Sequence, residues 1–185
     1  MRIVIVLFSL TVFGFANTAR PDSQPALQSS QNLKQSATTA CDLYAYVIDP
    51  DPKGLNVRNA PNNTALIRGR LKPGENGVVV HVTAASANWL KIEDAEAMDD
   101  DNPVFEGSGW VFAQMLATSI RSPDAARTPI YKAPSKQGGI VTKVPAEEEV
   151  KLVGCRGGWA KVAYNGKEGW LPPESQCGNP VTTCP

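Results

Sequence analysis

The sequence has only one histidine, four cysteines and no net charge in its 185 residues. Any acid–base chemistry that needs an imidazole therefore depends on His81 alone. Equal numbers of basic and acidic residues, 18 of each, exclude a nucleic-acid binder that works by bulk positive charge. Turn-forming residues are plentiful, with 15 glycines and 15 prolines, and this favours short strands joined by loops.

Long apolar runs are also missing, except at the start of the chain. Met1 and Arg2 give a short positive start, residues 3–13 are almost entirely apolar, and small residues follow. This order is typical of a secretory signal peptide, which we predict over residues 1–19. The apolar run is too short to cross a membrane as a helix. We therefore predict a secreted or periplasmic protein with no stable membrane insertion after the signal is cleaved.

Residues 20–40 lack aromatic residues and are rich in Ser, Gln, Ala and Thr. Such a segment can bury little apolar surface, so it is interpreted as a flexible linker. From Cys41 onward the composition changes to β-branched runs, tryptophans and turn residues. The folded part is expected to begin there.

The four cysteines are expected to form disulfides, because an exported protein folds in an oxidising compartment. They are Cys41, Cys155, Cys177 and Cys184. Sequence alone leaves three pairings open. We expect Cys155 to pair with one of the two tail cysteines and Cys41 with the other. Clustered cysteine and histidine ligands are absent from the sequence, so neither a metal ion nor a cofactor is predicted.

The folded part contains an internal repeat, which is the most informative feature of the chain. Each half has an Ala-Pro turn, a β-branched run, a Trp-x-Lys-[Ile/Val] motif and a Gly-Trp-[Val/Leu] motif, in that order. We call residues 41–120 the first repeat and residues 121–185 the second repeat. Apolar residues alternate with a period of two, which predicts strands. Asn165-Gly166 lies between two such strands of the second repeat and predicts a tight hairpin turn. The fold class expected is all-β, with one small antiparallel barrel for each repeat.

Three blocks of the first repeat resemble the bacterial SH3-like (SH3b) domain family. These are Leu55-Asn56-Val57-Arg58-Asn59-Ala60-Pro61, Asn88-Trp89-Leu90-Lys91-Ile92 and Gly109-Trp110-Val111. In the second repeat only the tryptophan motifs hold, because Ile130-Tyr131-Lys132-Ala133-Pro134 replaces the opening block. The resemblance implies two five-stranded barrels in tandem. It also implies a non-catalytic module of exported bacterial proteins, with peptidoglycan, its peptide stems or envelope proteins as ligands.

The residues expected to contact a ligand are Tyr46, Asn56, Arg58, Trp89 and Trp110. Trp89 is expected to line a groove with Tyr46, Asn56 and Arg58, where a peptide or the face of a sugar could stack. The competing interpretation is structural: the tryptophan of each Trp-x-Lys motif packs over the barrel core, and the family resemblance implies that Arg58 and Asn59 fix the first loop.

The first repeat carries an acidic insertion over residues 93–107 of its Trp-motif hairpin. Its seven acidic residues are Glu93, Asp94, Glu96, Asp99, Asp100, Asp101 and Glu106. Their spacing does not match a known calcium loop, so we predict a solvated insertion, with weak calcium binding as the alternative. The insertion also makes the first repeat acidic, whereas the second repeat is basic. Residues 41–120 hold 6 basic and 11 acidic residues, whereas residues 121–185 hold 9 basic and 6 acidic ones.

These observations favour a binding protein over an enzyme. Cys155 is expected to be oxidised, His81 lies inside an alternating valine run, and the carboxylates are not placed in an apolar pocket that would raise a pKa. The function predicted is non-catalytic recognition of cell-wall peptidoglycan or of an envelope protein. Two alternatives remain: a structural or assembly protein whose barrels mediate protein contacts, and an unrecognised hydrolase.

Overall fold

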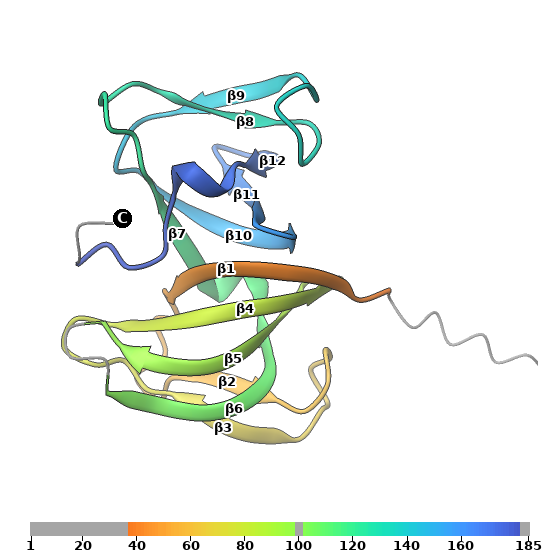
Figure 1. Cartoon of the computed structure of the whole chain (residues 1–185). Helices are drawn as coiled ribbons and strands as arrows, with labels where there is room; N and C mark the ends of the chain where they lie inside the picture. The colour runs from red at the N-terminus through yellow and green to blue at the C-terminus, as the bar shows by residue number, and fades with distance from the viewer. Residues whose placement is uncertain (1–36, 99–101, 182–185) are drawn as a thin grey trace, which may run out of the picture. The chain divides into compact units, whose positions relative to one another are not determined.

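The structure is a computed structural model that describes residues 37–98 and 102–181, and in this part of the chain it consists of thirteen strands and two short 3-10 helices (Figure 1). The elements up to residue 120 are β1 (Thr39–Val47), β2 (Leu55–Arg58), β3 (Ile67–Leu71), β4 (Val78–Ser86), β5 (Trp89–Ala97), β6 (Pro103–Phe112), η1 (Ala113–Met115) and β7 (Leu116–Ile120). Those that follow are β8 (Thr128–Tyr131), β9 (Ile140–Val144), β10 (Glu149–Arg156), β11 (Trp159–Tyr164), β12 (Lys167–Leu171), η2 (Pro173–Ser175) and β13 (Gln176–Cys177). The all-β prediction is confirmed.

The predicted signal peptide lies outside the described residues, as does most of the predicted linker. Thr39 and Ala40, which the sequence assigns to the linker, are the first two residues of β1. The first strand therefore begins two residues before Cys41.

Alternation of apolar residues decides which face of each strand is buried. Val78, Val80 and Val82 of β4 are at most 1 % exposed, whereas Val79 and His81 between them are partly exposed. Side chains in a strand point alternately to the two faces, so this pattern gives the strand one buried face. Most buried apolar residues of both repeats form one contiguous hydrophobic cluster, and Tyr46, Met98 and Ala117 form a small second one.

Strand pairing repeats itself along the chain. The named strands pair antiparallel in the order β3-β2-β6-β5-β4-β1-β7-β10-β11-β12-β8-β9, with β13 paired to β7. β1 pairs with β4 and β7, and β7 in turn pairs with β10 and β13. A 3-10 helix precedes both β7 and β13. β7 is thus the last strand of the first repeat and also takes the place of a first strand in the second, so the two repeats share it.

The pairing expected for Cys155 is wrong. Cys155 on β10 is bonded to Cys41 on β1, and the two Cα atoms are 5.7 Å apart. The start of β1 runs beside the β10–β11 turn, where the Asp42 amide donates to the Gly157 carbonyl at 2.9 Å and the Gly157 amide donates to the Ala40 carbonyl at 2.8 Å. This crossing brings the two cysteines together, and the bond links the first repeat to the second. Cys177 is also disulfide-bonded, and Cys184 lies outside the described residues.

The hairpin turn at Asn165-Gly166 is confirmed. Both residues have positive φ, 47° and 73°, as the tight turn requires. β11 and β12 pair directly on either side of it.

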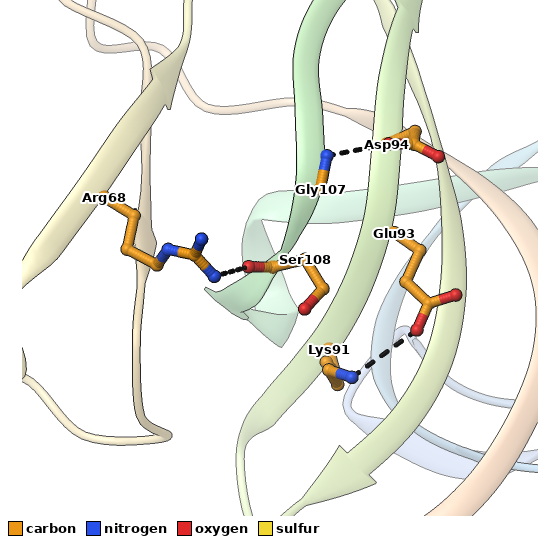
Figure 2. A network of polar contacts seen from close by, with 6 residues as sticks. All are labelled: Arg68, Lys91, Glu93, Asp94, Gly107 and Ser108. Carbon is orange, nitrogen blue, oxygen red and sulfur yellow. Dashed lines mark hydrogen bonds and ion pairs between the residues drawn. The ribbon is translucent and has the colours of Figure 1, made fainter.

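The acidic insertion is built mainly from strand. Its two arms continue β5 and β6, which makes this hairpin longer than its counterpart β11–β12. The pairing slips at Asp94, whose φ is +56°. Figure 2 shows how this irregularity is held: Asp94 Oδ1 accepts a hydrogen bond from the Gly107 amide at 2.8 Å, and Arg68 donates to the Ser108 carbonyl. Glu93, Asp94, Glu96 and Glu106 therefore lie on paired strands, whereas Asp99, Asp100 and Asp101 lie outside the described residues.

Candidate functional site

A groove lies on the first repeat where β2, the start of β5 and the end of β6 meet. Its cavity volume is about 220 Å³. It is lined by Asp49, Leu55, Asn56, Arg58, Asn63, Trp89, Phe112 and Met115. Three of the five residues predicted from the sequence, Asn56, Arg58 and Trp89, are among them.

Strand register explains why these side chains share one face. Trp89 on β5 is directly opposite Phe112 on β6, and Trp110 is opposite both Lys91 on β5 and Arg58 on β2. Residues directly opposite in an antiparallel pair point to the same side, and so do residues two apart in one strand. This face is the outer one, because Leu90, Ile92 and Val111 between them are fully buried.

Asn56 is the most unusual polar group in the groove. Its Oδ1 atom is buried and has no hydrogen-bond partner, a condition shared in the described chain only with the Thr83 hydroxyl. A buried carbonyl without a partner costs free energy, typically about 1–3 kcal/mol. The Asn56 oxygen is thus an unused hydrogen-bond acceptor on a residue that lines the groove.

Arg58 has a structural role as well as a place in the groove. Its Nη1 atom donates to the Ala65 carbonyl at 2.7 Å, which ties the β2–β3 loop to β2. A guanidinium has five N–H donors, so one such bond leaves donors for a carboxylate or a carbonyl. The interpretation that Arg58 fixes the first loop agrees with this contact.

Trp89 combines the two roles considered for it. Its side chain is only 8 % exposed and packs edge-on against Phe112, with the ring centroids 5.8 Å apart. It also lines the groove, so one part of the ring supports the fold while another part forms the wall of the cavity. Trp110 lies on the same outer face beside Arg58, but it is not part of the cavity lining.

Tyr46 is not part of the groove. It is 5 % exposed, and its hydroxyl contacts the Ser119 hydroxyl at 2.9 Å and donates to Glu149 at 3.1 Å. These partners lie on β7 and β10, so Tyr46 packs where the two repeats join. Burial, with a smaller contribution from the Glu149 charge, raises the pKa of Tyr46 to about 12.

We expect this tyrosine to make stability fall at high pH. An exposed tyrosine has a pKa of 10.0, so between pH 10.0 and about 12 the folded protein keeps a proton that the unfolded chain loses. The stabilising contribution is complete below that range and is lost as the pH rises through it. Urea unfolding across this range should show a steeper fall for the wild type than for Tyr46→Phe. Parallel pH profiles for the two proteins would contradict this assignment.

The second repeat presents different chemistry at the equivalent place. Tyr131 stands opposite Trp170, as Arg58 stands opposite Trp110. The Tyr131 ring packs edge-on against Trp159, with the centroids 6.0 Å apart. An aromatic ring therefore replaces the guanidinium, so the two repeats are not expected to bind the same ligand.

Sequence reasoning missed five of the groove residues, which are Asp49, Leu55, Asn63, Phe112 and Met115. Phe112 could have been found, because it lies two residues after Trp110 and therefore on the same face. Asp49 and Asn63 lie in loops, and Met115 lies in η1. No periodic pattern in the sequence places these three.

The chemistry needed for a cysteine nucleophile is not present at Cys155. A thiolate is the nucleophile in such enzymes, and the Cys155 sulfur is bonded to Cys41. His81 instead contacts Asp42 at 2.8 Å and stacks on Tyr44.

Two family models described as bacterial SH3 domain match the chain, one over residues 51–98 and the other over residues 126–175. The chain thus belongs to the bacterial SH3 domain family and carries two such domains in tandem. These domains and the Cys41–Cys155 disulfide together indicate a location outside the cytoplasm. Within residues 37–98 and 102–181, no helix is long and apolar enough to cross a lipid bilayer.

Comparison with curated proteins finds no match. Solved structures similar to the chain include NlpC2 and NlpC1 from Trichomonas vaginalis, at 15 % and 16 % identity and TM-scores of 0.29 and 0.30. They cover 76 % and 77 % of this chain, which spans only 48 % of each of them. A candidate autolysin from Listeria monocytogenes is similar at 14 % identity and a TM-score of 0.25. The matched region covers 76 % of this chain and 64 % of the autolysin chain.

Proposed function

We propose that this chain is an exported, non-catalytic protein that binds cell-wall material, peptidoglycan or its peptides, through the groove of the first repeat. The observation that carries the proposal is the unpartnered Oδ1 of Asn56 in the groove lining. Membership of the bacterial SH3 domain family supports the choice of ligand class.

The chemistry of the groove suits a short peptide that ends in a carboxylate. A peptide N–H can donate to Asn56, the carboxylate can accept from Arg58, and an apolar side chain can pack on Trp89. Asp49 lies in the same lining and disfavours a ligand with a second carboxylate near it. Peptide stems of the cell wall offer these groups together.

Asn56→Leu is expected to weaken binding to purified peptidoglycan about tenfold, because it removes one hydrogen-bond acceptor from the groove. It should leave stability unchanged or slightly raised, because Asn56 Oδ1 has no partner to lose. Cosedimentation with insoluble peptidoglycan at low ionic strength measures the binding, and urea unfolding measures the stability.

Thr83→Val is the matched control. It also removes a buried oxygen without a partner, but Thr83 does not line the groove, so binding should be retained. Equal loss in both variants would contradict the groove assignment. Failure of the wild type to sediment would overturn the cell-wall proposal and favour an envelope protein as the partner, the alternative that the family membership also supports.

A further inference from the structure

The groove of the first repeat holds two side chains of opposite charge that do not pair with each other. They are Asp49 and Arg58, and the other residues of the lining are uncharged. Within the part of the chain that the structure describes, neither of the two forms an ion pair with any side chain. Both charges are therefore available to a ligand in the same cavity, and a ligand that carries both an anion and a cation is complementary to it.

Asp49 is fixed at the groove by the loop that follows β1. The Ile48 amide donates to the Met115 carbonyl at 2.9 Å, and Met115 also lines the groove. Asp49 Oδ1 accepts a hydrogen bond from the Asp51 amide at 3.0 Å. A carboxylate has two oxygens, so the second oxygen of Asp49 remains for a donor on a ligand.

Strand β2 supplies the other polar groups of the groove. Arg58 uses Nη1 to donate to the Ala65 carbonyl at 2.7 Å, which orients the guanidinium and leaves its other N–H groups for a carboxylate. Asn56, two residues earlier on the same strand, adds the buried Oδ1 that has no partner. Together with Asp49, these groups line one cavity of about 220 Å³, which is small enough for a single residue of a peptide to contact all three.

We infer that the groove selects a peptide whose last residue carries both a free carboxylate and a free side-chain amine. This inference rests on the proposed function, because it names the kind of peptide that the groove binds. The terminal carboxylate accepts from Arg58, the backbone N–H of the last residue donates to Asn56, and the side-chain ammonium donates to Asp49. Asp49 is then the residue that determines specificity for the amine.

This specificity would distinguish two chemical states of a cell-wall peptide. Acylation of the side-chain amine, which is the reaction that joins one such peptide to another, replaces the ammonium by a neutral amide. The amide has no positive charge for Asp49, whereas the carboxylate for Arg58 is unchanged. The protein would therefore bind peptides that are not cross-linked through this amine in preference to those that are.

The experiment is an NMR titration of the full chain with Nα-acetyl-alanyl-lysine and with its Nε-acetylated form, at low ionic strength. The form with the free amine should bind about fivefold more tightly, as expected for one partly exposed ion pair. Conversion of its terminal carboxylate to an amide should weaken binding about fivefold as well. In Asp49→Asn the free and acetylated amines should bind equally, because the asparagine oxygen keeps the hydrogen bond from the Asp51 amide but carries no charge for the ammonium.

Asp51→Asn is the matched control. Asp51 lies in the same loop, is exposed, and accepts the Lys53 amide through Oδ1 at 2.9 Å, but it does not line the groove. This variant should keep the fivefold preference for the free amine. Equal binding of the two peptides by the wild type, binding of neither, or a preference that survives in Asp49→Asn would overturn the inference. An equal loss of preference in Asp49→Asn and Asp51→Asn would overturn it too.

Cosedimentation with peptidoglycan separates a failure of this inference from a failure of the proposed function. A wild type that sediments, loses binding in Asn56→Leu and yet ignores acetylation of the amine keeps the proposed function and lacks the specificity inferred here. A wild type that neither sediments nor binds the dipeptide fails both tests.

Discussion

Replacing both Cys41 and Cys155 by alanine is expected to lower the free energy of unfolding by about 4 kcal/mol. The bond joins residues 114 positions apart, so it removes much of the conformational freedom of the unfolded chain. Both cysteines are also buried, so the loss of two sulfur atoms from the core adds to the effect. Urea unfolding followed by tryptophan fluorescence measures the change. The dependence on urea should also steepen, because an unfolded chain without the cross-link exposes more surface.

The control for this experiment removes the other two cysteines and leaves the Cys41–Cys155 bond in place. Cys177→Ala/Cys184→Ala should keep a midpoint much closer to that of the wild type. If both double variants lose the same stability, the long-range link is not the cause. A Cys41→Ala/Cys155→Ala protein as stable as the wild type would contradict the prediction outright.

The pairing behind this prediction could not be derived from the sequence. Four cysteines allow three pairings, and nothing in the spacing favours one. The choice depends on where the start of β1 runs, which is fixed by two backbone hydrogen bonds to Gly157 across more than a hundred residues. Contacts of this kind leave no local pattern.

Local patterns did predict the strands and the turn. Valines at alternate positions of β4 and the Asn165-Gly166 turn are short-range features, and the structure confirms both. The sharing of β7 was missed, because its sequence, Leu116–Ile120, looks like the closing strand of one repeat alone. The pairing of β7 with β10 joins residues that are far apart in the sequence, and the repeat pattern did not reveal it.

The groove was predicted only in part, because local patterns place some of its residues and long-range packing places the others. Asn56 and Arg58 lie two apart in one strand, and Trp89 lies in a motif that recurs in each repeat, so their common face follows from the strand period. The sequence assigned Tyr46 to the groove, but the structure buries its side chain, unlike that of Tyr44 two positions before it on β1. Tyr44 is exposed, whereas Tyr46 is covered by β7 and β10. The packing of the second repeat decides this, and the first repeat alone does not show it.

Because β7 is shared, Leu116→Ala is expected to destabilise both repeats together, by about 3 kcal/mol. Leu116 is fully buried at the start of β7, and the core it belongs to includes residues of both repeats. Loss of its side chain leaves a cavity in that common core. Native-state hydrogen exchange tests this, because it reports the opening free energy of each strand separately. Amides of β4 in the first repeat and β11 in the second should lose protection by the same amount.

Leu66→Ala is the control, because Leu66 is 71 % exposed and should change neither set of amides. Loss of protection in β4 alone would show that the repeats unfold separately, and the shared strand would then not couple them. Equal loss in both would mean that the groove on the first repeat depends on the integrity of the second. The second repeat would then contribute to binding even where it contacts no ligand, because it keeps β7, and through β7 the strand β1, in place.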